Sequence, residues 1–167
     1  MARLFTMLLA LALATGAVAA PAHGDVPPDA IGVNLAGDKV TLSQYKGKAV
    51  VLSFWATWCG YCLKELPVLH NIQKAAGSDN VQVLAINTEE RKVFKRVTKA
   101  LESLEIGMLH DAKGDVREAY GVQGIPHLVI IGRDGRIVSV HRGYDEKMLD
   151  AIAHNINLAM AQGAQTQ

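Results

Sequence analysis

The first half of the chain contains two stretches in which most positions are apolar. These are residues 49–56, AVVLSFWA, and residues 81–88, VQVLAINT. Runs of this kind are typical of strands that are buried on both faces of a mostly parallel sheet. Between them, from Gly60 until Gly77, apolar residues recur near the helical spacing of ~3.6 residues. This order predicts a parallel βαβ unit.

The second half of the chain predicts a different arrangement. Residues 89–105 have the pattern of a charged amphipathic helix. Two strands are expected within residues 126–143, joined at Asp134-Gly135, a dipeptide typical of hairpin turns. A last helix is predicted from about residue 145 to residue 161. We therefore predict an α/β fold with a central mixed β-sheet that has helices on both faces.

The N-terminal residues have the layout of a secretory signal peptide. A positive charge at Arg3 precedes an apolar run from Leu4, and residues 17–19, AVA, match the small-residue signal for cleavage before Ala20. An uncleaved membrane anchor is the alternative, because the run approaches the roughly 18 apolar residues of a spanning helix. In either case we expect the folded part to be exported to an oxidising space, the periplasm.

The remainder of the chain has the length of one domain. A segment rich in Pro and Gly follows the leader and is interpreted as an exposed linker. The alternating residues 39–48 predict a short edge strand and a loop. The expected organisation is a signal peptide over residues 1–19, a linker over 20–32, a single α/β domain over 33–162 and a flexible tail over 163–167.

Charge and cysteine content exclude several classes of function. The chain has 17 Lys and Arg against 16 Asp and Glu, so removal of Arg3 with the leader leaves 16 of each. This neutrality argues against nucleic acid and anionic membranes as partners. The chain has only two cysteines, Cys59 and Cys62. A disulfide between them would close so small a loop that a purely structural bridge is disfavoured.

The position of the two cysteines predicts their chemistry. A strand that ends at Trp55 and a helix that begins near Gly60 place Cys59 at the helix N-terminus, where free N–H groups and the helix dipole favour a thiolate. Cys62 lies one turn later and is expected to be shielded, which suits attack on a mixed disulfide that Cys59 has formed. Because C-x-x-C beside a βαβ pattern is typical of redox proteins, we predict dithiol-disulfide exchange.

Two segments carry a resemblance to a known family. Residues 50–69, VVLSFWATWCGYCLKELPVL, resemble the active-site segment of the thioredoxin superfamily, and in particular its exported TlpA/ResA-like branch. Residues 119–138, AYGVQGIPHLVIIGRDGRIV, resemble the second signature of that branch. The resemblance implies a thioredoxin-like fold and a thiol:disulfide oxidoreductase that needs no cofactor and no metal.

The resemblance also implies roles for individual residues. Cys59 would be the attacking cysteine and Cys62 the resolving one, and together they would form the redox-active disulfide. Pro126 would be a cis-proline that lies against the dithiol. Trp58, Ile125 and Pro126 would form the substrate-binding surface, with the backbone of Ile125 free to pair with a client strand.

Two positions depart from the pattern of the superfamily. Cytosolic thioredoxins have a buried acid six residues before the first cysteine, where this chain has Ser53. Glu65 is the expected substitute: beside Cys62 its pKa would be raised, and it could exchange a proton with the thiol. The alternative is a surface glutamate paired with a lysine. His127 stands where the family more often has threonine, and we favour a residue on the sheet surface over a substrate-facing group.

The resemblance implies partners as well. We expect disulfide-bearing exported clients, of the type found in cytochrome c maturation or copper-site assembly, and a membrane electron donor of the DsbD type. The reductase direction is favoured because Gly60-Tyr61 lacks the histidine of strongly oxidising members, and a monomer is expected. The alternative function is a Cu(I)-binding or metal-delivery module with Cys59 and Cys62 as ligands, either alone or together with His127.

Overall fold

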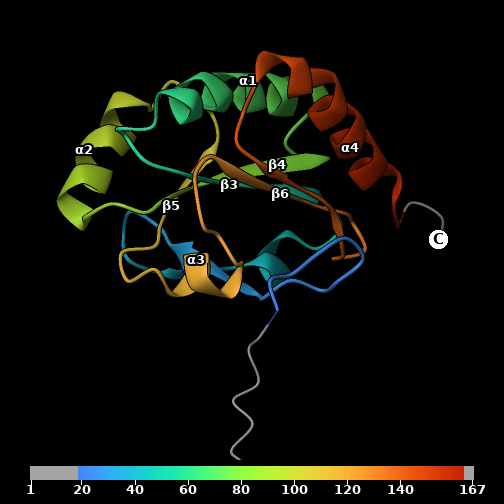
Figure 1. The fold of residues 1–167 in the computed structure, drawn as a ribbon, viewed down its shortest axis with the longest axis horizontal. Coiled ribbons are helices and arrows are strands. Elements are labelled where there is room, and N and C mark those ends of the chain that lie inside the picture. Colours follow the sequence, from blue (N-terminus) through green and yellow to red (C-terminus); the bar gives the residue numbers. More distant parts are fainter. Residues whose placement is uncertain (1–18, 164–167) are drawn as a thin grey trace, which may run out of the picture.

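The computed structural model describes residues 19–163 (Figure 1). Within them a seven-stranded sheet has the order β2-β1-β5-β4-β3-β6-β7. The strands are β1 (Ala30–Val33), β2 (Lys39–Thr41), β3 (Ala49–Trp55), β4 (Val81–Asn87), β5 (Gly107–His110), β6 (His127–Ile131) and β7 (Ile137–Arg142). The helices are α1 (Gly60–Ala76), α2 (Arg91–Ala100), α3 (Asp115–Ala119) and α4 (Leu149–Ala161), with 3₁₀ turns η1 (Leu42–Tyr45) and η2 (Glu146–Met148).

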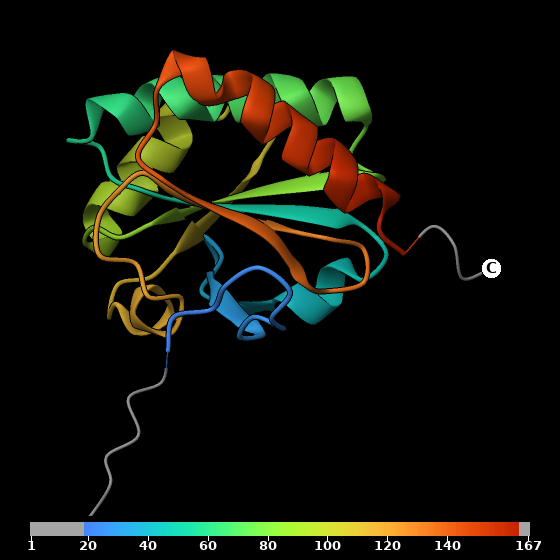
Figure 2. The same ribbon diagram turned by 45° about the vertical axis from the view of Figure 1, so that its right-hand side comes forward.

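The centre of the sheet accounts for the two apolar runs. β3 pairs in parallel with β4 and antiparallel with β6, and all of its residues are buried. Its side chains alternate between two cores: Val51 and Trp55 lie in the core under α1 and α4, whereas Val50 and Phe54 lie in the core on the α3 side. Figures 1 and 2 show α1 and α4 over one face of the sheet and α3 over the other. The predicted α/β fold, with a mixed sheet and helices on both faces, is confirmed.

The junction between β3 and α1 is fixed by the first cysteine. Cys59 has extended backbone geometry and is the N-cap of α1, and its Sγ accepts a hydrogen bond from the backbone N–H of Cys62 at 3.2 Å. The helix ends at Gly77, which has φ of 83° and donates its N–H to the carbonyl of Gln73 at 2.8 Å. Glycine is suited to such a left-handed C-terminal position. Because Cys59 caps α1 directly after β3, both cysteines lie at the C-terminal end of this central strand.

Two strands and the N-terminal segment differ from the sequence-based expectation. β1 begins at Ala30, so the end of the predicted linker over 20–32 belongs to the sheet. Further upstream, the N–H of Gly24 binds the carbonyl of Ile137 at 2.8 Å, and the N–H of Ile137 binds the carbonyl of Asp25 at 2.9 Å. These bonds attach the N-terminal segment to the start of β7. β5 was not expected either, because residues 107–110 were assigned to no element.

Some expectations fall outside what the structure describes. Residues 1–18 of the predicted signal peptide and residues 164–167 of the predicted tail lie outside the described residues.

The helix predicted over residues 89–105 is shorter, with α2 ending at Ala100. Within residues 19–163, no helix has the length and apolar character needed to cross a membrane.

Candidate active site

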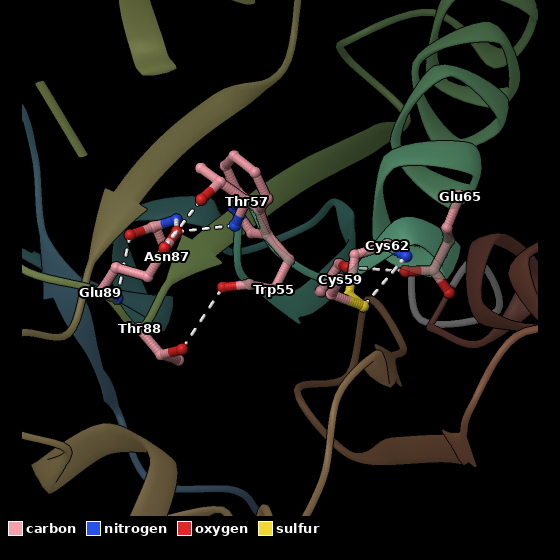
Figure 3. Close-up of a disulfide and its surroundings, with 9 residues drawn as sticks. Trp55, Thr57, Cys59, Cys62, Glu65, Asn87, Thr88 and Glu89 are labelled. Carbon is pink, nitrogen blue, oxygen red and sulfur yellow. Dashed lines mark hydrogen bonds between the residues drawn. A yellow bond between two sulfur atoms is a disulfide. The ribbon is translucent and has the colours of Figure 1, made fainter. Parts of the chain in front are cut away.

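Cys59 and Cys62 form a disulfide at the N-terminus of α1 (Figure 3). Their exposure differs, because Cys59 retains 7% of its accessible surface and Cys62 retains none. Only Cys59 can therefore be approached from solvent without movement of the protein. A thiol at this N-cap also lies where the helix dipole and unpaired N–H groups favour the thiolate.

Glu65 lies on the same face of α1, one turn after Cys62, and it is only 1% exposed. Its Oε2 accepts a hydrogen bond from the hydroxyl of Ser53 at 2.8 Å. Burial raises the pKa of Glu65 from 4.5 to about 7, although the Ser53 hydrogen bond acts in the opposite direction. The alternative of a surface glutamate paired with a lysine is wrong.

The cis-proline and the exposed tryptophan both lie near the C-terminal end of β3. The peptide bond between Ile125 and Pro126 is cis, as the resemblance implied. Strand register pairs Phe54 with the residue after Pro126, which places the proline at the end of β3. Trp58 is 74% exposed and lines a groove of about 540 Å³ together with Ile125, Thr88 and residues from the segments 113–118 and 122–124. The structure thus brings Trp58, the residue before Cys59, and Ile125 to one open surface.

A second glutamate near the disulfide was not identified from the sequence. Glu89 accepts hydrogen bonds from the backbone N–H of Thr57 at 2.6 Å, from its hydroxyl at 2.8 Å and from the side-chain amide of Asn87 at 3.1 Å. The N–H of Thr88 also binds the carbonyl of Trp55 at 3.2 Å. Figure 3 shows how these contacts join the loop before Cys59 to the end of β4.

The pKa of Glu89 moves in the opposite direction to that of Glu65. Partial burial alone would raise the pKa of Glu89, but its hydrogen bonds with Thr57 and Asn87 and the charge of Arg96 together lower it. The signal that could have located this residue is the position of Asn87-Thr88-Glu89. Asn87 is the last residue of β4 and the other two follow it, and the carboxyl ends of neighbouring parallel strands such as β3 and β4 lie side by side.

Comparison with known proteins agrees with this site. A model of the Redoxin family matches residues 22–156. The chain belongs to the Redoxin family. It is 30% identical over 133 residues to the thiol-disulfide oxidoreductase ResA of Bacillus subtilis strain 168, covering 80% of this chain and 73% of ResA. It is also 35% identical to the thioredoxin-like protein YneN of the same strain, covering 72% of each chain.

Solved structures show the same relationship. This Redoxin superposes with a TM-score of 0.73 on a Chlorobium tepidum protein proposed to be the thiol:disulfide interchange protein DsbE, at 28% identity over 85% of this chain and 99% of the other. The pneumococcal exposed lipoprotein thioredoxin Etrx1 from Streptococcus pneumoniae TIGR4 gives a TM-score of 0.63 at 36% identity, covering 75% and 96%. With its thioredoxin-like fold and its C-x-x-C disulfide, this Redoxin is a thiol-disulfide oxidoreductase of the ResA-like type.

His127 is not on the sheet surface, and that expectation is wrong. The side chain is 1% exposed, and its ring packs edge-on against Phe54 with the centroids 5.9 Å apart. Burial, with a smaller contribution from the charge of Arg142, lowers the pKa of His127 to about 4. Phe54 lies in the core on the α3 side, whereas Cys59 and Cys62 lie in the core under α1.

The same arrangement bears on the metal-delivery alternative. Because His127 and the cysteines point to opposite faces of the sheet, they do not form one ligand set. Within residues 19–163, no three His, Cys, Asp or Glu side chains are grouped so that they could hold a metal ion. The version of that alternative in which His127 joins the two cysteines is therefore wrong.

Proposed function

We propose that this Redoxin reduces disulfide bonds of exported client proteins, with Cys59 as the attacking thiolate and Cys62 as the resolving thiol. The observation that carries the proposal is the asymmetry of the pair. Cys59 is the partly exposed N-cap, while Cys62 is fully buried one turn into the helix. This arrangement suits a first attack from outside and a second attack from within.

The reaction proceeds by two exchanges that conserve electrons. The Cys59 thiolate attacks one sulfur of the client disulfide, forms a mixed disulfide and releases the other client sulfur as a thiolate. The Cys62 sulfur then attacks Sγ of Cys59, which forms the bond seen in the structure and releases the second client thiolate. Two electrons pass from the dithiol to the client, and each client thiolate takes a proton. An external dithiol donor must then reduce the protein again.

Glu65 serves as the proton acceptor for the second step. The Cys62 thiol must lose its proton before it attacks, and it is shielded from bulk water. A carboxylate on the same helix face, with a pKa of about 7, can accept that proton near neutral pH. After the donor has reduced the disulfide, the proton returns to Cys62. Glu65 is therefore assigned as a general base rather than as a structural acid.

Client proteins bind at the surface formed by Trp58, Ile125 and Pro126. Support comes from the groove that Trp58 and Ile125 line, because Trp58 directly precedes Cys59. The clients belong to cytochrome c maturation or copper-site assembly, and a membrane donor of the DsbD type supplies the electrons. The protein acts in the periplasm as a monomer after removal of residues 1–19. N-terminal sequencing of the exported form that found Met1 would contradict the removal of the leader.

The roles of the two cysteines can be tested by trapping. Reduced Cys62→Ser, mixed with a synthetic peptide that contains one intramolecular disulfide and quenched by alkylation, should accumulate a covalent adduct visible by mass spectrometry. Cys59→Ser should form little adduct, and the variant with both serines is the control. Equal trapping by the two single variants would overturn the assignment of attacker and resolver.

The direction of the reaction needs a second measurement. A reductase couple should have a reduction potential nearer to the roughly −270 mV of thioredoxin than to the roughly −120 mV of strong oxidants. Equilibration of the Cys59/Cys62 pair with glutathione buffers measures this value. A potential more positive than about −180 mV would contradict the reductase direction while leaving the exchange chemistry intact.

A further inference from the structure

A serine lies in the middle of the most buried strand. Ser53 is the fifth residue of β3 and is fully buried, with Ala85 of β4 and Leu128 of β6 as its neighbours in the sheet. A buried hydroxyl is unfavourable unless it is hydrogen-bonded. The hydroxyl of Ser53 donates to Oε2 of Glu65 at 2.8 Å, which bridges β3 and α1.

This hydrogen bond gives one carboxyl oxygen of Glu65 a donor and leaves the other without one. Oε2 is held by Ser53, whereas Oε1 is buried and has no hydrogen-bond partner among residues 19–163. Helical side chains tilt towards the N-terminus, and residues three apart share a face, so the carboxyl of Glu65 is directed to the turn that carries Cys62. Figure 3 shows Glu65 extending from α1 next to Cys62. A buried oxygen without a partner calls for an explanation.

We propose that Ser53 is the positioning residue of the exchange reaction: its hydroxyl holds one oxygen of Glu65, so that the other stays free to accept the proton of Cys62. This inference rests on the proposed role of Glu65. In the disulfide form the free oxygen has no donor, and in the dithiol form the Cys62 thiol supplies one. When Cys59 holds a client in a mixed disulfide, the proton passes from Sγ of Cys62 to Oε1, and the Cys62 sulfur attacks Sγ of Cys59, whose bond to the client sulfur breaks and releases the client thiolate.

The hydroxyl also keeps the carboxylate available. A hydrogen bond to an ionised carboxylate favours the charged form, against the burial that disfavours it. Other titratable groups also lie in this region. Tyr144 lies in the same core as Cys62, and the charges of Glu146, Glu65 and Asp145 add to the burial that raises its pKa. Asp145 and Glu146 line a pocket with Tyr144 and Lys64. Within residues 19–163, Ser53 is the only residue that donates a hydrogen bond to the carboxyl group of Glu65.

The test compares side chains at residue 53 with and without a hydroxyl. Ser53→Ala removes the donor, and Ser53→Thr retains it. Ser139→Ala, in β7, is the matched control, because the hydroxyl of Ser139 contacts His141 rather than Glu65. The measurements are the pH titration of the Glu65 carboxyl carbon by NMR, in the disulfide form, and the pH profile of Cys62 resolution by stopped flow.

We expect Ser53→Ala to raise the midpoint of the Glu65 titration by about one pH unit, since loss of a hydrogen bond to a charge has that scale. The ascending part of the rate profile should move by the same amount in the same direction. Ser53→Thr should restore both, and Ser139→Ala should change neither. If Ser53→Ala does not fold, Ser53→Val replaces it, because Val matches Thr in shape and lacks only the hydroxyl.

The outcomes separate this inference from the function on which it rests. If Glu65→Gln alters the pH profile but Ser53→Ala overlaps the wild type in both measurements, the role of Ser53 is overturned and that of Glu65 stands. If Glu65→Gln overlaps the wild type as well, the base itself is wrong. In a Glu65→Gln background, Ser53→Ala should leave the rate profile unchanged. A shift there would show that Ser53 acts by another route.

Discussion

Two glutamates lie on either side of the disulfide, and their surroundings shift their pKa values in opposite directions (Figure 3). Glu65, on the α1 side, is almost fully buried and has one neutral hydroxyl as donor, so its pKa is raised to about 7. Glu89, at the end of β4, is only partly buried and receives three hydrogen bonds from Thr57 and Asn87, so its pKa is lowered. The same residue type is thus ionised on one side of the cysteines and close to half protonated at neutral pH on the other.

The difference shows what each environment is suited for. Three donors hold the Glu89 charge permanently, and a permanent charge can fix a loop but cannot carry a proton at pH 7. A carboxyl with a pKa near ambient pH can both accept and return a proton. The number of donors, set against the depth of burial, therefore separates a structural glutamate from a catalytic one.

The largest expected effect is on stability at alkaline pH. The folded pKa of Glu65 lies above its ordinary value of 4.5, so ionisation destabilises the folded state: the cost is absent below pH 4.5 and complete above pH 7. Glu65→Gln cannot ionise and should increase the free energy of unfolding at pH 8 by about 3 kcal/mol. Urea unfolding of the wild type and of Glu65→Gln, both oxidised, at pH 4 and pH 8 measures this difference, because the comparison of the two proteins at each pH cancels the contribution of other groups such as His127. A difference between the two proteins that is the same at both pH values would show that Glu65 is not buried as a carboxyl.

The same substitution should have a slightly smaller effect on the reaction. Glu65→Gln should slow resolution by Cys62 on the order of 10²-fold at pH 7, because general-base catalysis has this scale. The first attack by Cys59 should stay within a few-fold of the wild type. Stopped-flow reduction of a model disulfide from pH 5 to pH 9 separates the two steps. Glu89→Gln is the matched control. A similar loss of resolution rate in that variant would show that the two glutamates do not differ in their role.

The smallest expected effect concerns the stability contribution of Glu89. Glu89→Gln places an amide N–H₂ against donors of Thr57 and Asn87, and should cost about 1 kcal/mol of unfolding free energy at pH 7. Because the folded pKa of Glu89 is lowered, this contribution is present above pH 4.5 and is lost as the pH falls through the folded pKa. Urea unfolding should show the deficit shrinking on acidification. A deficit that grew towards low pH would contradict the assigned charge state.

Much of the central βαβ unit could be predicted, because its signals are local. The buried run of β3, the helical spacing of α1 and the position of the cysteines between them are all contained in residues 49–76. Glu65 could be inferred because the resemblance implies an acid near the dithiol, Ser53 is not one, and Glu65 lies one helical turn after Cys62. The expected rise of its pKa is confirmed.

The features that were missed depend on contacts between distant segments. Gly32 interrupts the apolar pattern of β1, yet a Cβ there would come within 2.9 Å of the carbonyl oxygen of His110 in β5, so the glycine permits the pairing. Glu89 appeared to be the first residue of a charged helix, and its bonds to Thr57 span 32 residues. His127 was assigned to the surface because a single strand does not reveal that Phe54 and Tyr120 fill the space on that face.

The attachment of residues 24 and 25 to β7 limits where the N-terminus can be trimmed. The side chain of His23 also reaches the carbonyl of Val138 at 2.7 Å, so residues 23–25 dock as a short unit. Proteolytic processing before Ala20, as proposed, would spare this unit and leave only three residues ahead of it. Processing a few residues later would remove partners from the edge of β7 and leave backbone groups of Ile137 to water. The export machinery can therefore cleave the chain only at positions before residue 23 if the hydrogen bonds at the edge strand β7 are to be kept.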